Sequence, residues 1–333
     1  MDNFLTTNGL DKGTLENLIE SAINFKNSRW SIERPIGGRS VALVFFNPSL
    51  RTRASMQIGI HELGGNSVVL EPGSTSWTLE HRESVVMDGD KTEHIKEFVQ
   101  VLERYVSAIG VRTFAALKNW EEERMDPILN AFAKYASVPV INLESAMHHP
   151  LQAMADIMTI RENLGKSKKK VLLTWAWHPK PLPMAVPNSF ALAAAQFGHD
   201  VRIAHPRGFE LDEELLNEIE LQAEMNGGSV EYSNNINESF DGADVVYAKS
   251  WGSKHFYGDR NGDIRERSAY RDKWIVDEPK MAKTKNAVFM HCLPVRRNVI
   301  VTDAVIDSPN SIVLDQAENR LHIQKAILTE LFK

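Results

Sequence analysis

Eight short apolar segments, separated by stretches with helical periodicity, constrain the fold of this chain more than any other feature. They are rich in valine and isoleucine, and several are apolar throughout, which is typical of parallel strands covered on both faces. Regular alternation of such strands with helices predicts an α/β fold built on open, doubly wound parallel sheets. The eight predicted strands are Ser40–Phe46, Ser67–Leu70, Val106–Val111, Val138–Leu143, Val171–Trp177, Val201–Ala204, Asp244–Ala248 and Ala287–Met290.

Helix signals fill the intervals between these strands. Met56, Ile60 and Leu63 recur at helical spacing before a glycine pair, and a second helix is predicted over Asp212–Met225. The strands are interrupted near residues 145–170, which predicts two sheets and therefore two domains. Further helices are predicted over Gln152–Leu164, as a connection between the domains, and over Glu318–Phe332.

Composition narrows the class of protein. The 333 residues are enough for two domains of ordinary size. The formal net charge of -6 argues against a nucleic-acid-binding protein, which would need a basic face. Because Cys292 is the only cysteine, neither an intramolecular disulfide nor a cysteine-rich metal site is expected. No run of about 18 apolar residues and no signal-peptide core occur, so we expect no membrane span and a cytoplasmic location.

Polar or reactive residues directly follow six of the eight predicted strands. Ligands of open parallel sheets bind beyond the carboxyl ends of the strands, so these residues are candidates for one site. Chance would scatter them along the chain instead. The six groups are Ser49–Arg53, Arg112, Glu144 with His148–Gln152, His178, Lys249–Gly252 and His291–Arg297.

The first of these groups has the features of an anion-binding turn. Pro48 ends the strand, Ser49 is a predicted helix N-cap, and Arg51 and Thr52 follow in the first helical turn. Free N–H groups and a partial positive charge at a helix N-terminus suit an anion, and the Arg51 guanidinium matches phosphate oxygens. Taken alone, the turn fits simple capping with solvated arginines equally well. The glycine-rich patterns of nucleotide-binding loops are absent.

Three segments resemble the signatures of the aspartate/ornithine carbamoyltransferase family, in the family's order and spacing. They are Phe46–Thr52, His149–Gln152 and His291–Pro294, and the resemblance covers essentially the whole chain. It implies a carbamoyl phosphate-binding domain over residues 1–148, an amine-binding domain over 149–317, and a C-terminal helix over 318–333 that packs back on the first domain. It also implies a homotrimer with shared active sites.

The branch of the family that acts on N-acetyl- or N-succinyl-ornithine is the most similar. Ordinary ornithine enzymes carry an aspartate and a Ser-Met-Gly loop where this chain has Lys249. A lysine there would repel a free α-ammonium and would suit an α-nitrogen that is a neutral amide. The Pro-rich stretch His178–Pro187 also resembles this branch, in which it belongs to a knotted crossing of the second domain.

The resemblance assigns roles to individual residues. Thr52, Arg112 and His149 should stabilise the carbonyl oxygen, and Cys292 should assist the amine. Gln152 should orient the carbamoyl NH2, and Trp77 should reach a neighbouring subunit's site. The residues expected to bind carbamoyl phosphate are Ser49, Leu50, Arg51, Thr52, Trp77, Arg112, His149, Gln152, Cys292, Leu293 and Arg320. The residues expected to bind the acyl-ornithine are Thr92, Glu144, His178, Lys249, Cys292, Leu293 and Arg296. Neither a metal nor an organic cofactor is expected.

The acyl group is predicted from the loop that contains Thr92. The branch members that use the acetyl substrate carry a glutamate there and a lysine where this chain has Ile300. A glutamate would repel a succinyl carboxylate, and Thr92 does not. The sequence therefore predicts N-succinyl-L-ornithine as the acceptor, with N-acetyl-L-ornithine as the alternative.

Each of these residues could instead have a purely structural role. Trp77 alone is more often a core or surface aromatic, Cys292 a small buried hydrophobe, and Glu144 a helix cap. A non-catalytic anion-binding homologue is disfavoured because Arg51 and Arg112 are both present, as is His149. Among enzymes, aspartate carbamoyltransferase is the rival, and the Cys292-Leu293 pair weighs against it.

Overall fold

The computed structural model describes residues 1–31 and 33–333, and the chain forms two compact units. Unit 1 comprises Met1–Ala115, Glu121–Leu151 and Arg320–Lys333, and unit 2 comprises Ala116–Trp120 and Gln152–Asn319. The chain therefore passes between the units after Ala115 and inside three helices, α4 (Trp120–Glu123), α6 (Pro150–Leu164) and α13 (Val313–Leu331). Among the described helices, none is both long and apolar enough to cross a membrane.

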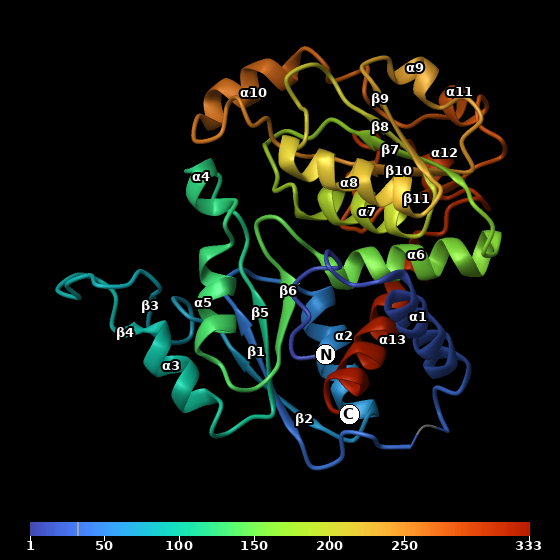
Figure 1. The fold of residues 1–333 in the computed structure, drawn as a ribbon. Helices are drawn as coiled ribbons and strands as arrows, with labels where there is room; N and C mark the ends of the chain where they lie inside the picture. Colours follow the sequence, from blue (N-terminus) through green and yellow to red (C-terminus); the bar gives the residue numbers. More distant parts are fainter. Residues whose placement is uncertain (32) are drawn as a thin grey trace. The chain divides into compact units, whose positions relative to one another are not determined.

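A four-stranded parallel sheet forms the centre of unit 1, in the order β2-β1-β5-β6. Helices α3 and α5 cover one face of the sheet, and α1, α2 and the end of α13 cover the other (Figure 1). The strands are β1 (Ser40–Phe45), β2 (Asn66–Leu70), β5 (Ala108–Arg112) and β6 (Val140–Glu144), and β3 (Leu79–Glu80) pairs separately with β4 (Glu93–His94). The helices are α1 (Lys12–Asn27), α2 (Arg51–Glu62), α3 (Ile95–Leu102), α4 (Trp120–Glu123) and α5 (Pro127–Tyr135).

The apolar character of these strands follows from their burial on both faces. Ala42 and Val44 of β1 pack into a cluster with Val99 of α3 and Phe132 of α5. On the other face, Gly59 lies close to Leu321 of α13, because a Cβ atom at Gly59 would be only 3.3 Å from the Leu321 Cδ1 atom. A side chain at this position would push α13 away from α2, so glycine allows the two helices to pack closely.

Unit 2 contains a five-stranded parallel sheet in the order β11-β10-β7-β8-β9. Helices α7 and α8 pack side by side in front of the sheet in Figure 1, and every residue of α7 is buried. The strands are β7 (Lys170–Trp175), β8 (Asp200–Ala204), β9 (Ser229–Ser233), β10 (Val245–Lys249) and β11 (Val288–Met290). The other helices are α7 (Ala185–Gln196), α8 (Glu213–Met225), α9 (Ile236–Ser239), α10 (Arg260–Ser268), α11 (Glu278–Met281) and α12 (Asp303–Ile306).

The predicted parallel sheets are confirmed, and each of the eight predicted strands is present with its ends within two residues of the prediction. The sequence missed β9 because it lies at the edge of the sheet and its side chains are exposed or only half-buried, so it has no continuous apolar run. It also placed the start of the last helix five residues late, at Glu318 instead of Val313. The acidic Asp315 lies in the first turn of that helix, where it interacts favourably with the helix dipole.

Candidate active site

In the turn between β1 and α2, Ser49 makes the capping hydrogen bond expected of it, although Leu50 and not Ser49 occupies the N-cap position. The Ser49 Oγ atom accepts a hydrogen bond from the Thr52 backbone N–H at 3.3 Å, although α2 itself begins at Arg51. Thr52 is buried, whereas the Leu50 side chain is 81% exposed. The first backbone N–H groups of α2 therefore lie at the carboxyl end of a parallel strand, which is a favourable place for an anion.

Arg320 of α13 reaches the same turn. Its Nη2 atom donates a hydrogen bond to the Thr52 Oγ1 atom at 2.6 Å, and the Arg320 side chain is buried. The turn thus gathers two arginines, Arg51 and Arg320, within unit 1. Two guanidinium groups beside a helix N-terminus favour binding of a doubly charged group such as phosphate.

A buried cluster of three charged or titratable groups lies at the carboxyl ends of β5 and β6. The Glu144 Oε2 atom accepts a hydrogen bond from Arg112 Nη1 at 2.5 Å and lies 3.4 Å from His149 Nε2. The Arg112 guanidinium also lies over the Phe114 ring, 4.2 Å from its centroid. Because all three groups of the cluster are buried, Glu144 holds Arg112 and His149 in fixed positions.

Asp126 orders the loop that leads from β6 to His149. Its carboxylate accepts hydrogen bonds from Ser145 Oγ at 2.7 Å and from the backbone N–H groups of Ala146 and Met147 at 2.7 and 3.3 Å. Burial raises the pKa of Asp126 to about 6, although these three donors act in the opposite direction. Sequence inspection missed this residue, since an aspartate before a proline gives only an ordinary helix-start signal.

Trp77 and Thr92 lie in one exposed part of unit 1. The Thr92 backbone N–H donates to the Thr78 carbonyl at 3.2 Å, beside the short β3–β4 pairing. The Trp77 indole is 55% exposed, and its Nε1 atom donates to Glu93 Oε2 at 2.6 Å. Both side chains are therefore accessible on the surface of unit 1.

His178 and Arg296 form a pair in unit 2. The Arg296 Nε atom donates to His178 Nε2 at 3.0 Å, so His178 Nε2 carries a lone pair, and its Nδ1–H is left to donate to the Lys180 carbonyl at 2.9 Å. Burial lowers the pKa of His178 to about 4, and the nearby positive charges of Arg296 and Lys249 contribute. His178 is accordingly neutral at pH 7, and the positive charge of this region comes from Arg296 and Lys249.

The loop after β11 carries Cys292 and Leu293. Leu293 has a φ of 56°, in the left-handed region that non-glycine residues seldom adopt. The Leu293 N–H donates to His291 Nδ1 at 2.9 Å, which holds the turn in this conformation. Cys292 is buried beside the Tyr247 hydroxyl of β10. The loop conformation is thus set by local hydrogen bonding and packing.

Gln152 lies at the start of α6, in unit 2, and its side chain is buried. Its Nε2 atom donates to Asp156 Oδ1 at 2.7 Å, and Gln316 of α13 donates to the same oxygen. The sequence did not single out Asp156 or Gln316. The spacing of four residues between Gln152 and Asp156 was the only available signal, because it places both side chains on one helix face.

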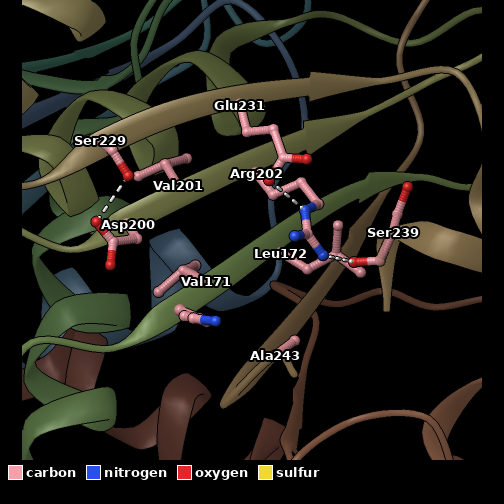
Figure 2. A pocket seen from close by; sticks show the side chains of 10 residues that line it. Val171, Leu172, Asp200, Val201, Arg202, Ser229, Glu231, Ser239 and Ala243 are labelled. Atoms are coloured by element: carbon pink, nitrogen blue, oxygen red, sulfur yellow. Dashed lines mark hydrogen bonds and ion pairs between the residues drawn. The ribbon is translucent and has the colours of Figure 1, made fainter. Parts of the chain in front are cut away.

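A cavity of about 140 Å³ in unit 2 contains none of the predicted site residues (Figure 2). It lies at the amino ends of strands, where Arg202 donates to Glu231 at 2.9 Å and Ser229 donates to Asp200 at 2.7 Å. Four of its polar side chains are therefore paired with one another. The lining residues are Lys170, Val171, Leu172, Asp200, Val201, Arg202, Ser229, Glu231, Ser239 and Ala243.

Models of two related protein domains match the two halves of the chain. Residues 2–162 match the carbamoyl-P binding domain of aspartate/ornithine carbamoyltransferases, and residues 183–331 match the Asp/Orn binding domain of the same family. The chain belongs to the aspartate/ornithine carbamoyltransferase family. The match extends over both units, so the family's two domains are both present in this carbamoyltransferase homologue.

Two kinds of relative are similar over almost their whole length. The N-acetylornithine carbamoyltransferase of Xanthomonas campestris pv. campestris is 46% identical, with 99% of this chain and 98% of the relative covered. The N-succinylornithine carbamoyltransferase of Bacteroides thetaiotaomicron is 40% identical, with 97% and 96% covered. A solved acetylornithine transcarbamylase complexed with acetylcitrulline has a TM-score of 0.96, 46% identity, and coverage of 99% of each chain.

A second solved structure bears on the acyl group. It is a glutamate-to-alanine mutant of N-acetyl-L-ornithine transcarbamylase complexed with carbamyl phosphate and N-succinyl-L-norvaline. Its TM-score is 0.96 at 46% identity, and the match covers 99% of the present chain and 100% of the solved chain.

Proposed function

We propose that the protein transfers the carbamoyl group of carbamoyl phosphate to the δ-amine of an N-acyl-L-ornithine, giving an N-acyl-L-citrulline and phosphate, as a step of arginine biosynthesis. The observation that carries this proposal is the Ser49–Thr52 turn with Arg320 against it, in a chain that belongs to the carbamoyltransferase family. The similarity to N-acetyl- and N-succinylornithine enzymes supports an acylated acceptor.

Carbamoyl phosphate would be held by unit 1. The phosphate would be bound by the first backbone N–H groups of α2 and by the guanidinium groups of Arg51 and Arg320. The amine lone pair attacks the carbonyl carbon, negative charge builds on the carbonyl oxygen, and the bond to the phosphate oxygen then breaks. Thr52, Arg112 and His149 would stabilise that oxygen, and preorganised donors of this kind contribute roughly 3 kcal/mol each. The phosphate leaves with the bonding electrons, and the proton that the amine loses passes to the departing phosphate.

Residues of unit 2 would bind the acceptor. Lys249 and Arg296 would interact with the α-carboxylate, since neutral His178 does not compete as a cation. The same positive charges disfavour a free α-ammonium, which supports an N-acylated substrate over ornithine. The Leu293 carbonyl and Cys292 would hold the δ-amine, in a loop that is already ordered. A role for Glu144 in acceptor binding, beyond its contact with Arg112, stays a prediction.

For the acyl group, the comparisons favour N-acetyl-L-ornithine, because the acetylornithine relative is 46% identical and the succinylornithine relative 40%. This reverses the order that we predicted from Thr92. The local sequence still makes N-succinyl-L-ornithine a specific second candidate. A glutamate mutant of the acetyl enzyme is complexed with a succinyl compound, and this chain carries uncharged Thr92 where we expect the acetyl enzymes to carry glutamate.

A panel of amines tests the proposal. Purified protein should consume carbamoyl phosphate when N-acetyl- or N-succinyl-ornithine is the acceptor. It should not consume carbamoyl phosphate with ornithine or with aspartate. Arg51→Ala should lose about 10- to 100-fold in carbamoyl phosphate affinity, as expected for a lost charged contact in the site. The matched control is Arg53→Ala, which removes an arginine of the same turn that pairs with Glu71 at 2.8 Å. Unchanged turnover by Arg51→Ala would contradict the proposal, and turnover with aspartate would favour the rival enzyme.

Three further expectations stay predictions: a homotrimer with shared sites, a knotted second domain, and a cytoplasmic location. They rest on the resemblance to the family and on composition. A non-catalytic homologue would bind carbamoyl phosphate in the same panel without releasing phosphate, so the assay separates that possibility as well.

A further inference from the structure

A chain of buried hydrogen bonds in unit 2 leads from the loop beside Cys292 to Gln152. It begins at the His291 backbone N–H, which donates to Gln316 Oε1 at 2.9 Å. Gln316 Nε2 then donates to Asp156 Oδ1 at 2.7 Å, and Gln152 Nε2 donates to the same oxygen at 2.7 Å. All four residues are buried, so water does not compete for these bonds.

The donors and acceptors in this chain fix the orientation of each carboxamide. A backbone N–H can only donate, so Gln316 must turn its oxygen towards His291 and its NH2 group towards Asp156. The Asp156 oxygen accepts from Gln316, and a second amide that meets the same oxygen must also offer its NH2 group. Gln152 is therefore held with its oxygen pointing away from Asp156.

The Gln152 oxygen is buried and has no hydrogen-bond partner within the part of the chain that the structure describes. A buried amide oxygen without a donor costs free energy, so it favours a ligand that supplies an N–H group. The carbamoyl group of carbamoyl phosphate carries such a group as its NH2.

We infer that Asp156 and Gln316 are positioning residues that make Gln152 present an oxygen, rather than an NH2 group, to the carbamoyl group. The inference rests on the proposed function. It makes selection of carbamoyl phosphate depend on residues that do not touch the substrate. Burial raises the pKa of the Tyr247 hydroxyl, and the neighbouring Asp156 and Cys292 raise it further, so this hydroxyl keeps its proton near the Asp156 carboxyl group.

Acetyl phosphate is the discriminating probe, because it has a methyl group in place of the NH2. Binding of carbamoyl phosphate and of acetyl phosphate would be measured by calorimetry on the full chain. In Asp156→Leu the preference for carbamoyl phosphate should fall by about 10- to 100-fold, which corresponds to one unsatisfied buried hydrogen bond. Acetyl phosphate affinity should stay within about twofold, because the phosphate contacts are unaffected.

Companion variants separate positioning from general damage. Asp156→Asn should keep the preference, because its carboxamide oxygen can accept both N–H groups. Gln316→Leu should lose part of the preference for carbamoyl phosphate over acetyl phosphate. This variant serves as the test if Asp156→Leu does not fold. Gln152→Leu should match Asp156→Leu, and the double variant should lose no more than either single change. The matched control is Thr159→Val on the same helix, which removes the buried acceptor of Asn319 at 2.8 Å without touching Gln152.

The outcomes are distinct. An equal loss of affinity for both phosphates in Asp156→Leu and Gln316→Leu would mean a structural role only and would overturn the inference. So would an unchanged preference in both variants, or a wild-type protein that binds the two phosphates equally. A wild-type protein that binds neither phosphate would instead refute the proposed function itself.

Discussion

The Arg320 guanidinium donates a 2.6 Å hydrogen bond to the Thr52 hydroxyl, although 268 residues separate them in the sequence. Thr52 lies at the start of α2, and Arg320 lies in α13, so two helices bring their polar groups to one turn. This contact places a second guanidinium beside the predicted phosphate site.

Arg320→Ala should weaken carbamoyl phosphate binding by about 10- to 100-fold, since a hydrogen bond from a charged group contributes roughly 1.5–3 kcal/mol. The dissociation constant measured by calorimetry checks this. The control is Arg39→Ala, which removes an exposed arginine that lies 4.6 Å over the Phe332 ring and is remote from Thr52 in its contacts. If Arg320→Ala binds as tightly as the wild-type protein, the arginine serves only to attach α13 to α2.

Trp77 should act in a site that is shared between subunits. Its exposed indole is available for contact beyond its own unit. Trp77→Ala and Arg51→Ala should each be nearly inactive alone. In randomly mixed trimers roughly a quarter of the sites would then combine both intact residues, so activity should return to that fraction. Mixing without subunit exchange is the control, and a fully active monomer in light scattering would refute the shared site.

Thr92→Glu should alter the choice of acyl group without altering stability, because the Thr92 side chain is exposed and only its backbone N–H is hydrogen-bonded. The added charge should lower kcat/KM for N-succinyl-L-ornithine by about 10-fold or more through repulsion of the succinyl carboxylate, and should change the acetyl value little. Thr92→Val is the neutral control. A glutamate variant that keeps its full succinyl activity would show that this loop does not contact the acyl group.

Asp126 should give the protein a pH-dependent stability. Its folded pKa is about 6, against an ordinary value of 3.8, so the folded state binds the proton more tightly. The associated stabilisation is complete below about pH 4 and is lost as the pH rises through 6, with a total of at most about 3 kcal/mol. In urea titrations, wild type should lose stability relative to Asp126→Asn over this interval.

Asp11 provides a control of opposite sign. It is the exposed N-cap of α1, and the hydrogen bonds from Thr14 lower its pKa. Its contribution is therefore present at neutral pH and is lost on acidification. A constant difference between wild type and Asp126→Asn from pH 4 to 6.5 would show that Asp126 does not titrate in this range.

Local signals made the sheets and the first turn of α2 predictable. Runs such as Val41–Phe45 lie buried on both sides of a sheet, and their composition reports that burial directly. The role of Ser49 as a cap was equally local, because its acceptor and the Thr52 N–H lie three residues apart.

Contacts between distant residues were out of reach. Gln316 donates a hydrogen bond to Asp156, which is 160 residues away in the sequence, and Arg112 donates to Glu144, which is 32 residues away. The local sequence around these residues contains no signal that predicts either pair. The strand β9 was missed for a different reason, since an edge strand with polar neighbours has no continuous apolar run.

The division of unit 1 along the sequence has a consequence for synthesis of the protein. Residues 320–331 of α13 leave the ribosome after all of unit 2, yet Lys325 is fully buried and pairs with Glu62 at 2.8 Å. Unit 1, although translated first, can therefore complete its packing only after α13 has been translated. A nascent chain released at residue 319 would lack both Lys325 and Arg320, so interrupted translation should yield products that are less stable and bind carbamoyl phosphate more weakly.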